Sequence, residues 1–419
     1  RFINKKLNMI FNKGTLEGEF IIPFNTDGSI GKDYGFSGKI FDASINLTKE
    51  FSLKNLTTEV NHKDDEFMII IKKGSIYDIE LEDSTINLKR NKNIIKIESI
   101  LKTKGKLNFS QINQISKLLD LNVNNFKNIN GIADLKTKIN FDVNKKYRIK
   151  NFSYLTEGDI PYLEIETEKQ DSIRKYLPEY DPKVVIKDNK IKFSNSNVDQ
   201  SLLLTGSIKA KDYFNNFEIS ETYNYNDKSY DINGNIDLTN SKVKISRLNY
   251  NKNYGKKSKI NFDIKFILGR YFNIKNLNFL AGKSKIVLSD IKLNKNFEVN
   301  DFEKIEIKTY ENEIKNNDFL IQKPKRVVIS GTVFDAEPLL KTLYNESEKK
   351  TFSKNFSSEI KINLDKAITG TDDDVFDLGM IAFINKGSYN KLSLKGNFSK
   401  DEIIEMSIYQ IDKDNKTLQ

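Results

Sequence analysis

The chain has 419 residues, of which 38% are hydrophobic, 11% aromatic and 30% charged, and its formal net charge is +10. The aromatic content argues against a disordered chain, and the low hydrophobic content favours a fold with a large surface for its core, such as an extended sheet. The sequence contains no cysteine, which excludes disulfides and thiolate metal sites. Its positive charges are scattered and form no tract, so nucleic acid is not an expected partner.

The sequence contains no apolar run close to the roughly 20 residues that a membrane-spanning helix needs. It opens at Arg1, and its last residues continue a strand-like pattern. We therefore expect a segment of a longer protein whose targeting element lies elsewhere.

A short motif, apolar-x-Gly-x-apolar, recurs along the whole chain. Its glycines are Gly18, Gly38, Gly206, Gly234, Gly331 and Gly396. The two apolar residues of each copy lie four apart, so in a strand they share a face with the glycine between them. Because glycine otherwise weakens a strand, each copy predicts a bend, a bulge or a close approach of neighbouring backbone. Six copies at irregular spacing indicate a degenerate repeat built of strands.

Between these motifs, apolar and polar residues predict strand after strand, with Asn-rich turns at 195–197 and 251–253. The strand-like stretches are 36–48, 67–71, 76–81, 94–98, 135–143, 260–266 and 286–293, the last with a slip in phase near Ser289 and Asp290. In two of them the alternation is clearest, and the apolar residues there are Leu135, Ile139, Phe141, Ile260, Phe262, Ile264 and Phe266. The pattern predicts a mainly β fold: a long, twisted and curled antiparallel sheet with one apolar and one polar face, forming an elongated groove.

Three helical stretches interrupt the strands, and we expect them to cover or plug the sheet. They are 110–121, with Ser110 as its cap; 172–177; and 334–348, where Asp335 caps a helix with Leu339, Leu340 and Leu343 on one face. The expected organisation is a β-rich repeat region over 1–109, the helix 110–121, an extended sheet over 122–333, the helix 334–348, and a β-rich region over 349–419.

Candidate chemistry is sparse. The acidic loop Thr371–Asp374 lacks the spaced oxygen ligands of a calcium loop and is expected to be a solvated turn. The single histidine, His62, is expected to be an exposed turn residue. The sequence contains no nucleophile elbow, phosphate-binding glycine loop or metal-ligand cluster. We therefore expect no enzyme activity, no cofactor and no metal.

An amphipathic sheet of this length leaves two arrangements open. Its apolar face is either exposed to a partner or lipid, or closed by a second sheet or by the helices.

The strand-to-helix stretch Val328–Leu343, which contains SGTVFDAEPLL, resembles a segment of the AsmA-like superfamily, in particular the YhdP-type proteins of Gram-negative bacteria. Residues 230–419 are similar to that segment in the order of their strands. The resemblance implies a periplasmic envelope protein, anchored in the inner membrane by an N-terminal helix. It implies that phospholipid or another lipid travels along an apolar β-groove between the inner and outer membranes, and that membrane contact is made by parts outside this segment.

On this resemblance the seven alternating apolar residues would line the path of the acyl chains. Two other functions fit the strand pattern. One is a structural or adhesive β-solenoid with a closed, dry core. The other is an outer-membrane β-barrel or assembly factor, which needs an apolar band about 25 Å tall.

Overall fold

The computed structural model describes residues 11–418 apart from 32–33, 47–51, 78, 120–125, 147, 268, 296–298, 324, 345–356, 387, 399–401 and 411–415. Within these residues strands predominate and the helices are few and short, so the predicted mainly β fold is confirmed. The chain divides into two compact units. The first comprises Arg1–Lys169, Asp181–Lys209 and Thr222–Asn226, and the second comprises Gln170–Tyr180, Ala210–Glu221 and Asp227–Gln419.

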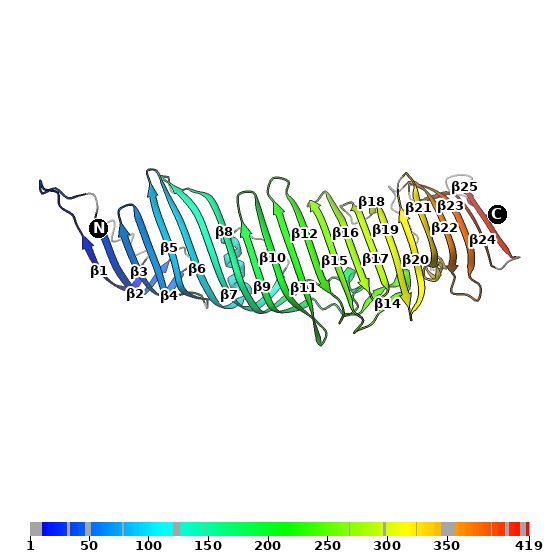
Figure 1. The fold of residues 1–419 in the computed structure, drawn as a ribbon, viewed down its shortest axis with the longest axis horizontal. Helices are drawn as coiled ribbons and strands as arrows, with labels where there is room; N and C mark the ends of the chain where they lie inside the picture. Colours follow the sequence, from blue (N-terminus) through cyan, green and yellow to red (C-terminus); the bar gives the residue numbers. More distant parts are fainter. Residues whose placement is uncertain are drawn as a thin grey trace. The chain divides into compact units, whose positions relative to one another are not determined.

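The first unit is a sheet in which each strand pairs antiparallel with the next one along the chain (Figure 1). Its strands are β1 (Phe11–Ile21), β2 (Gly35–Asn46), β3 (Ser52–Lys63), β4 (Glu66–Ile76), β5 (Ile79–Asn91), β6 (Ile94–Asn108), β7 (Phe126–Asn144), β8 (Ile149–Thr167), β9 (Lys183–Asn195) and β10 (Asp199–Ala210). On β7, Ile129, Gly131 and Ala133 are buried and the residues between them are exposed. This period of two gives the sheet one apolar and one polar face, as predicted.

The helix α2 (Phe109–Leu119) follows β6 directly and contacts β6 and β7. Two reciprocal hydrogen bonds close its first turn: Gln111 N donates to Asn108 Oδ1, and Asn108 N donates to Gln111 Oε1, both at 3.0 Å. This is a capping box, in which residues three apart satisfy each other's free amides. The helix predicted over 110–121 is therefore present, but Asn108 caps it in place of Ser110. Residues 120–121 lie outside the described part.

The second unit is also a sheet, with neighbouring strands paired in the orders β12–β15–β16–β17–β19–β20–β21 and β22–β23–β24–β25–β26. The strands are β12 (Ser229–Asp237), β15 (Ser258–Ile267), β16 (Tyr271–Ala281), β17 (Ser284–Leu293), β18 (Val299–Asp301), β19 (Lys304–Glu311), β20 (Ile314–Gln322), β21 (Val327–Asp335), β22 (Ser358–Ile368), β23 (Val375–Asn385), β24 (Ser388–Asn397), β25 (Ile403–Gln410) and β26 (Lys416–Leu418). β11 (Tyr213–Asn224) contains residues of both units.

One strand pair departs from the predicted antiparallel sheet. β21 and β22 run parallel. Parallel neighbours need a crossover connection, and the chain between them contains the helix α4 (Glu337–Tyr344).

The junction predicted at 334–348 lies in this crossover. Asp335 still belongs to β21, and the helix begins at Glu337, later than expected; residues 345–348 lie outside the described part. Asp335 Oδ1 accepts a hydrogen bond from the Glu337 amide at 3.2 Å, so the carboxylate caps the helix as predicted. The Asp335 side chain is also buried, which capping alone does not require.

Between β12 and β15 the chain leaves the sheet. Residues 238–252, which we call the insert, contain a two-stranded ribbon of β13 (Val243–Ile245) and β14 (Tyr250–Lys252) joined by the 3-10 turn η1 (Ser246–Leu248). The turn predicted at 251–253 is therefore wrong, because Asn251 and Lys252 pair in this ribbon. The helix predicted at 172–177 is present as the shorter α3 (Asp171–Arg174). Two residues after this helix, the backbone oxygen of Tyr176 accepts a hydrogen bond from the Lys244 amide of the insert at 2.9 Å.

Positive φ angles explain two irregularities of the predicted strands. The stretch 76–81 is a hairpin and not a strand: β4 ends at Ile76, β5 begins at Ile79, and Tyr77 has φ 54°. The slip in phase predicted within β17 is confirmed at Asp290, whose φ is 51°. Beyond it Ile291 pairs with Ile274, so the apolar residues stay on one face.

Two of the recurrent glycines, Gly234 and Gly331, lie against atoms of their register partners on the neighbouring strand. A Cβ on Gly234 would lie 2.6 Å from Cε1 of Phe262, its register partner on β15. A Cβ on Gly331 would lie 2.5 Å from Cα of Phe319, its partner on β20. Gly331 therefore fills two of the expected roles, a close approach of neighbouring backbone and a place at a register shift between β20 and β21, whereas Gly234 makes room for the ring of Phe262.

Candidate functional site

A row of apolar side chains crosses the second-unit sheet, one residue per strand. Each member is the register partner of the next across β15 to β25. The ten residues, which we call the second strip, are Phe262, Leu277, Leu288, Ile305, Ile321, Ile329, Ile362, Met380, Leu394 and Met406. All ten are half-buried. At about 4.8 Å per strand, the row extends over about 40 Å.

The first unit carries a similar row across β1 to β7, built by the same register rule. Its seven residues, which we call the first strip, are Phe20, Phe36, His62, Phe67, Leu88, Ile97 and Phe141. Phe20 is 72% exposed and Phe67 is 42% exposed. On β8, the ring of Phe152 lies 6.2 Å from that of Phe141 and extends the aromatic contacts by one strand.

His62 belongs to the first strip, and the expectation of an exposed turn residue is wrong. Its side chain is 8% exposed, and its ring centroid lies 4.1 Å from that of Phe67 and 5.3 Å from that of Tyr34. The residues next to it in sequence, Asn61 and Lys63, are exposed because alternate residues of a strand face opposite sides. Its polar neighbours in sequence therefore say nothing about its own face.

The seven residues predicted to line the lipid path are all half-buried. Leu135, Ile139 and Phe141 share one face of β7, and Phe141 is in the first strip. The other four share one face of β15, and they differ in their surroundings.

Among the β15 residues, Phe262 is in the second strip, and Ile264 pairs with Ile274. The Phe266 ring stacks on Tyr230, with centroids 4.7 Å apart. Ile260 packs against the buried core of the unit. The sequence pattern thus identified the apolar face, and the register shows which of its residues continue from strand to strand as one apolar row.

The face opposite the second strip carries paired charges. Lys275 Nζ lies 2.9 Å from Asp231 and 3.4 Å from Asp263, and Lys285 Nζ lies 2.7 Å from Glu306. The hydrogen bond to Asp231 raises the pKa of Lys275, and the hydrogen bond from Lys285 lowers the pKa of Glu306. Exposed pairs of this kind add little stability. They make this face polar over β12 to β19, in contrast to the strip behind it, whereas on β23 the same face carries the exposed Ile381 and Phe383.

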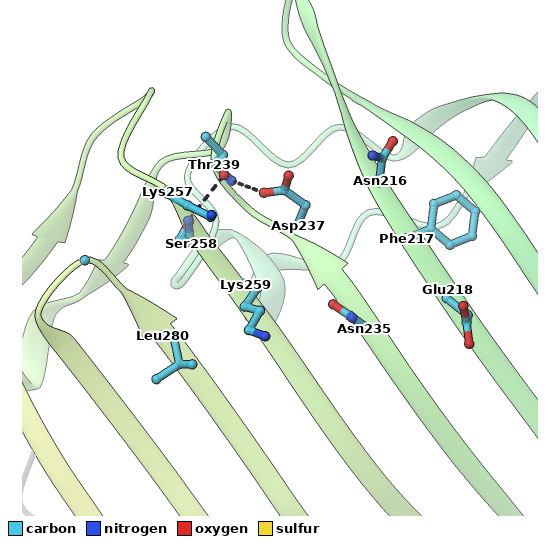
Figure 2. Close-up of a pocket in the computed structure, with 11 residues that line it drawn as sticks. Asn216, Phe217, Glu218, Asn235, Asp237, Thr239, Lys257, Ser258, Lys259 and Leu280 are labelled. Carbon is cyan, nitrogen blue, oxygen red and sulfur yellow. Dashed lines mark hydrogen bonds between the residues drawn. The ribbon is translucent and has the colours of Figure 1, made fainter.

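A cavity of about 590 Å³ lies in the second unit, between β11 and the ends of β12, β15 and β16 (Figure 2). Most of the residues that line it are polar or charged, and the charged ones are Glu218, Asp237, Lys257 and Lys259. Asp237 Oδ1 accepts a hydrogen bond from the Thr239 amide at 2.7 Å, so part of the wall is fixed by its own turn. Charges of both signs do not suit an acyl chain, and we assign no ligand to this cavity.

The acidic loop Thr371–Asp374 is held by its own interactions. Thr369 Oγ1 donates to Asp373 O at 2.7 Å, and Lys366 Nζ lies 2.7 Å from Asp374. Among the residues that the structure describes, no group of three or more His, Asp or Glu side chains is placed to hold a metal ion.

In the described part of the chain, no helix combines the length and the apolar character that crossing a bilayer requires. No family model matches the chain, and no curated protein matches it. The strips and their register are therefore the features from which its function is inferred.

Proposed function

We propose that the chain carries lipid, holding phospholipid acyl chains on its apolar strips while the headgroups stay in water. The observation that carries this proposal is the second strip, ten half-buried apolar residues on successive strands. The resemblance of Val328–Leu343 to the AsmA-like superfamily supports the setting: a periplasmic bridge between inner and outer membranes, anchored by parts outside this segment.

The energetics of the second strip suit transfer. An acyl chain lying on it is shielded from water, at about 0.8 kcal/mol for each CH₂ group that is buried. When the acyl chain moves along the strip by one strand, it leaves one apolar residue and contacts an equivalent one about 4.8 Å further on. The buried area therefore changes little during the movement, and the lipid meets no large barrier. Sliding of this kind needs no nucleotide or metal in the strip itself.

Photocrosslinking tests the proposal. Benzoylphenylalanine replaces Phe141 or Phe262 in the strips, and in matched controls replaces Asn140 or Asn261, the preceding residues on the opposite faces. The full chain is incubated with vesicles of phosphatidylethanolamine and phosphatidylglycerol, irradiated, and analysed by mass spectrometry. We expect phospholipid adducts at the two strip positions and not at the controls. Adducts that are absent, or equal at strip and control positions, would overturn the proposal and favour a purely structural sheet.

A further inference from the structure

The insert covers part of the apolar face of the second unit. Its residues Leu238, Val243 and Tyr250 are buried in one cluster with Phe279 and other residues of the sheet. Tyr250 is fully buried, and its ring centroid lies 6.1 Å from that of Phe279 in an edge-on arrangement. Residues 238–252 therefore lie on the sheet as a second layer at this place.

The covered residues form a row next to the second strip. Phe279 pairs with Ile286, Ile286 with Ile307, and Ile307 with Phe319. The exposed fractions of these four side chains are only 4–8%. Each lies two residues from a strip residue on its own strand, so two neighbouring rows on the same face differ in burial: the row next to the insert is buried and the strip is half-buried.

The other side of the strip is buried as well. Val327, Ile360 and Ala382 are register partners on β21, β22 and β23, and each lies two residues from a strip residue. Their side chains are 4%, 6% and 0% exposed. Over β21–β23 the row on this side of the strip is therefore buried, whereas the strip residues themselves are half-buried.

A buried polar cluster, which we call the latch, holds the turn of the insert. Asn249, in the left-handed conformation at the end of η1, donates from Nδ2 to Asp335 Oδ2 at 3.0 Å. Asn316 Nδ2 donates to the carbonyl oxygens of Leu248 and Asn249, both at 3.1 Å, and Asn317 Nδ2 donates to that of Leu248 at 2.8 Å.

The latch residues of the sheet are also bonded to one another. Thr309 Oγ1 donates to Asn316 Oδ1 at 2.8 Å and accepts from Asn317 Nδ2 at 2.9 Å. Thr309, Asn316, Asn317 and Asp335 are each at most 5% exposed. Because a buried polar group is stable only when it is bonded, these side chains favour the position of the insert seen here over alternatives.

Lys252 ties together the two ends of the insert. Its Nζ donates to the carbonyl oxygens of Leu238, Thr239 at 3.0 Å and Ser241 at 2.7 Å, and the side chain is 1% exposed. The insert is thus bonded at its turn by the latch and at its base by Lys252.

We propose that the insert is a fixed wall that confines lipid to the second strip, so that acyl chains pass through this unit in single file. This inference rests on the proposed function and adds to it the width of the path. The wall selects lipids that can present one chain at a time, and it keeps the row of Phe279, Ile286, Ile307 and Phe319 free of lipid.

The chain contains no cysteine, so a single introduced thiol reports on one position. Three consecutive residues of β19 supply matched positions: Ile305 in the strip, Glu306 on the opposite face, and Ile307 under the insert. The rate of reaction with N-ethylmaleimide is measured for Ile305→Cys, Glu306→Cys and Ile307→Cys, with and without vesicles of phosphatidylethanolamine and phosphatidylglycerol.

We expect the vesicles to slow the reaction of Ile305→Cys about tenfold, the protection that an occupancy of about nine-tenths gives. They should leave Glu306→Cys unchanged. Ile307→Cys should react slowly in both conditions, because its modification requires local opening of the insert.

Opening the wall is the second arm of the test. Asn249→Gly removes the amide that bonds Asp335 and keeps the left-handed backbone accessible. If this variant fails to fold, Lys252→Met loosens the base of the insert instead. In either background, Ile307→Cys should become reactive, and vesicles should then protect it.

The outcomes separate the two proposals. If vesicles protect none of the three thiols, the proposed lipid carriage fails. If they protect Ile305→Cys and Ile307→Cys equally in the otherwise unaltered chain, lipid carriage stands and the wall is refuted. The wall is also refuted if Ile307→Cys becomes reactive in the opened variant but vesicles do not protect it.

Discussion

Replacing Gly331 with alanine tests the close approach of β20 and β21. The new Cβ would lie 2.5 Å from Cα and 2.6 Å from Cβ of Phe319, and Asp318 O is also in contact. Since these atoms are backbone or fixed to it, no rotation of a side chain relieves the clash, and the strands must separate. Overpacking of this kind costs about 1–3 kcal/mol. Weakening one interstrand hydrogen bond adds about 1 kcal/mol. We therefore expect Gly331→Ala to lower the free energy of unfolding by about 2–4 kcal/mol.

Gly379 on β23 is the matched control, because the only neighbour of its added Cβ is Lys395 O at 4.0 Å. Gly379→Ala should raise the free energy of unfolding by about 0.5 kcal/mol, since alanine restricts the unfolded chain. Urea denaturation followed by circular dichroism measures both variants, and hydrogen exchange of β20 and β21 shows whether the loss is local. Equal stability of the two variants would refute the close approach.

Two further predictions concern single polar residues. Burial lowers the pKa of Lys252 in the folded protein to about 8, from the usual 10.5. Between pH 8 and pH 10.5 the unfolded chain therefore binds more protons than the folded one, and the free energy of unfolding rises with pH. Compared with Lys252→Met, the unaltered chain should show a free energy of unfolding that increases by about 2 kcal/mol between pH 8 and pH 10, measured by urea denaturation. A difference between the two proteins that does not change with pH would contradict this prediction. Asn108→Ala should destabilise α2 by about 1 kcal/mol, seen as faster hydrogen exchange of its amides. The control is Asn130→Ala, because Asn130 is exposed and is the cross-strand partner of Asn108. If both substitutions speed the exchange of the α2 amides equally, the capping box is excluded.

Much of the fold could be predicted from period-two patterns. The alternation of Phe262, Ile264 and Phe266 with polar residues depends only on the pleat of a strand, and the structure places all three on one face as expected. The helix cap at Asp335 was also predictable, because capping is a contact between residues close in sequence.

The second strip, the insert and the latch depend on contacts far apart in sequence. Asp335 is bonded to Asn249, 86 residues earlier, and to Asn316, 19 residues earlier. In the sequence each of the three has the polar character of a turn or surface residue. Lys252 has the same appearance within an Asn-rich run, although it is buried. One signal in the sequence could have indicated the insert. Three apolar residues lie close together there, Val243, Ile245 and Leu248, which are too many for a solvated loop.

The order of the strands has a consequence for how such a protein is made and how it changes. Apart from the β21–β22 crossover and the β17–β19 pair, which skips the short β18, the described pairings of the two strips join consecutive strands, so most contacts are local in sequence and we expect them to form early in folding. Each added hairpin would lengthen a strip by about 10 Å without altering the rest of the sheet. The length of a strip could therefore evolve by duplication of hairpins, and under the proposed lipid carriage the number of strands would set the distance over which an acyl chain is held.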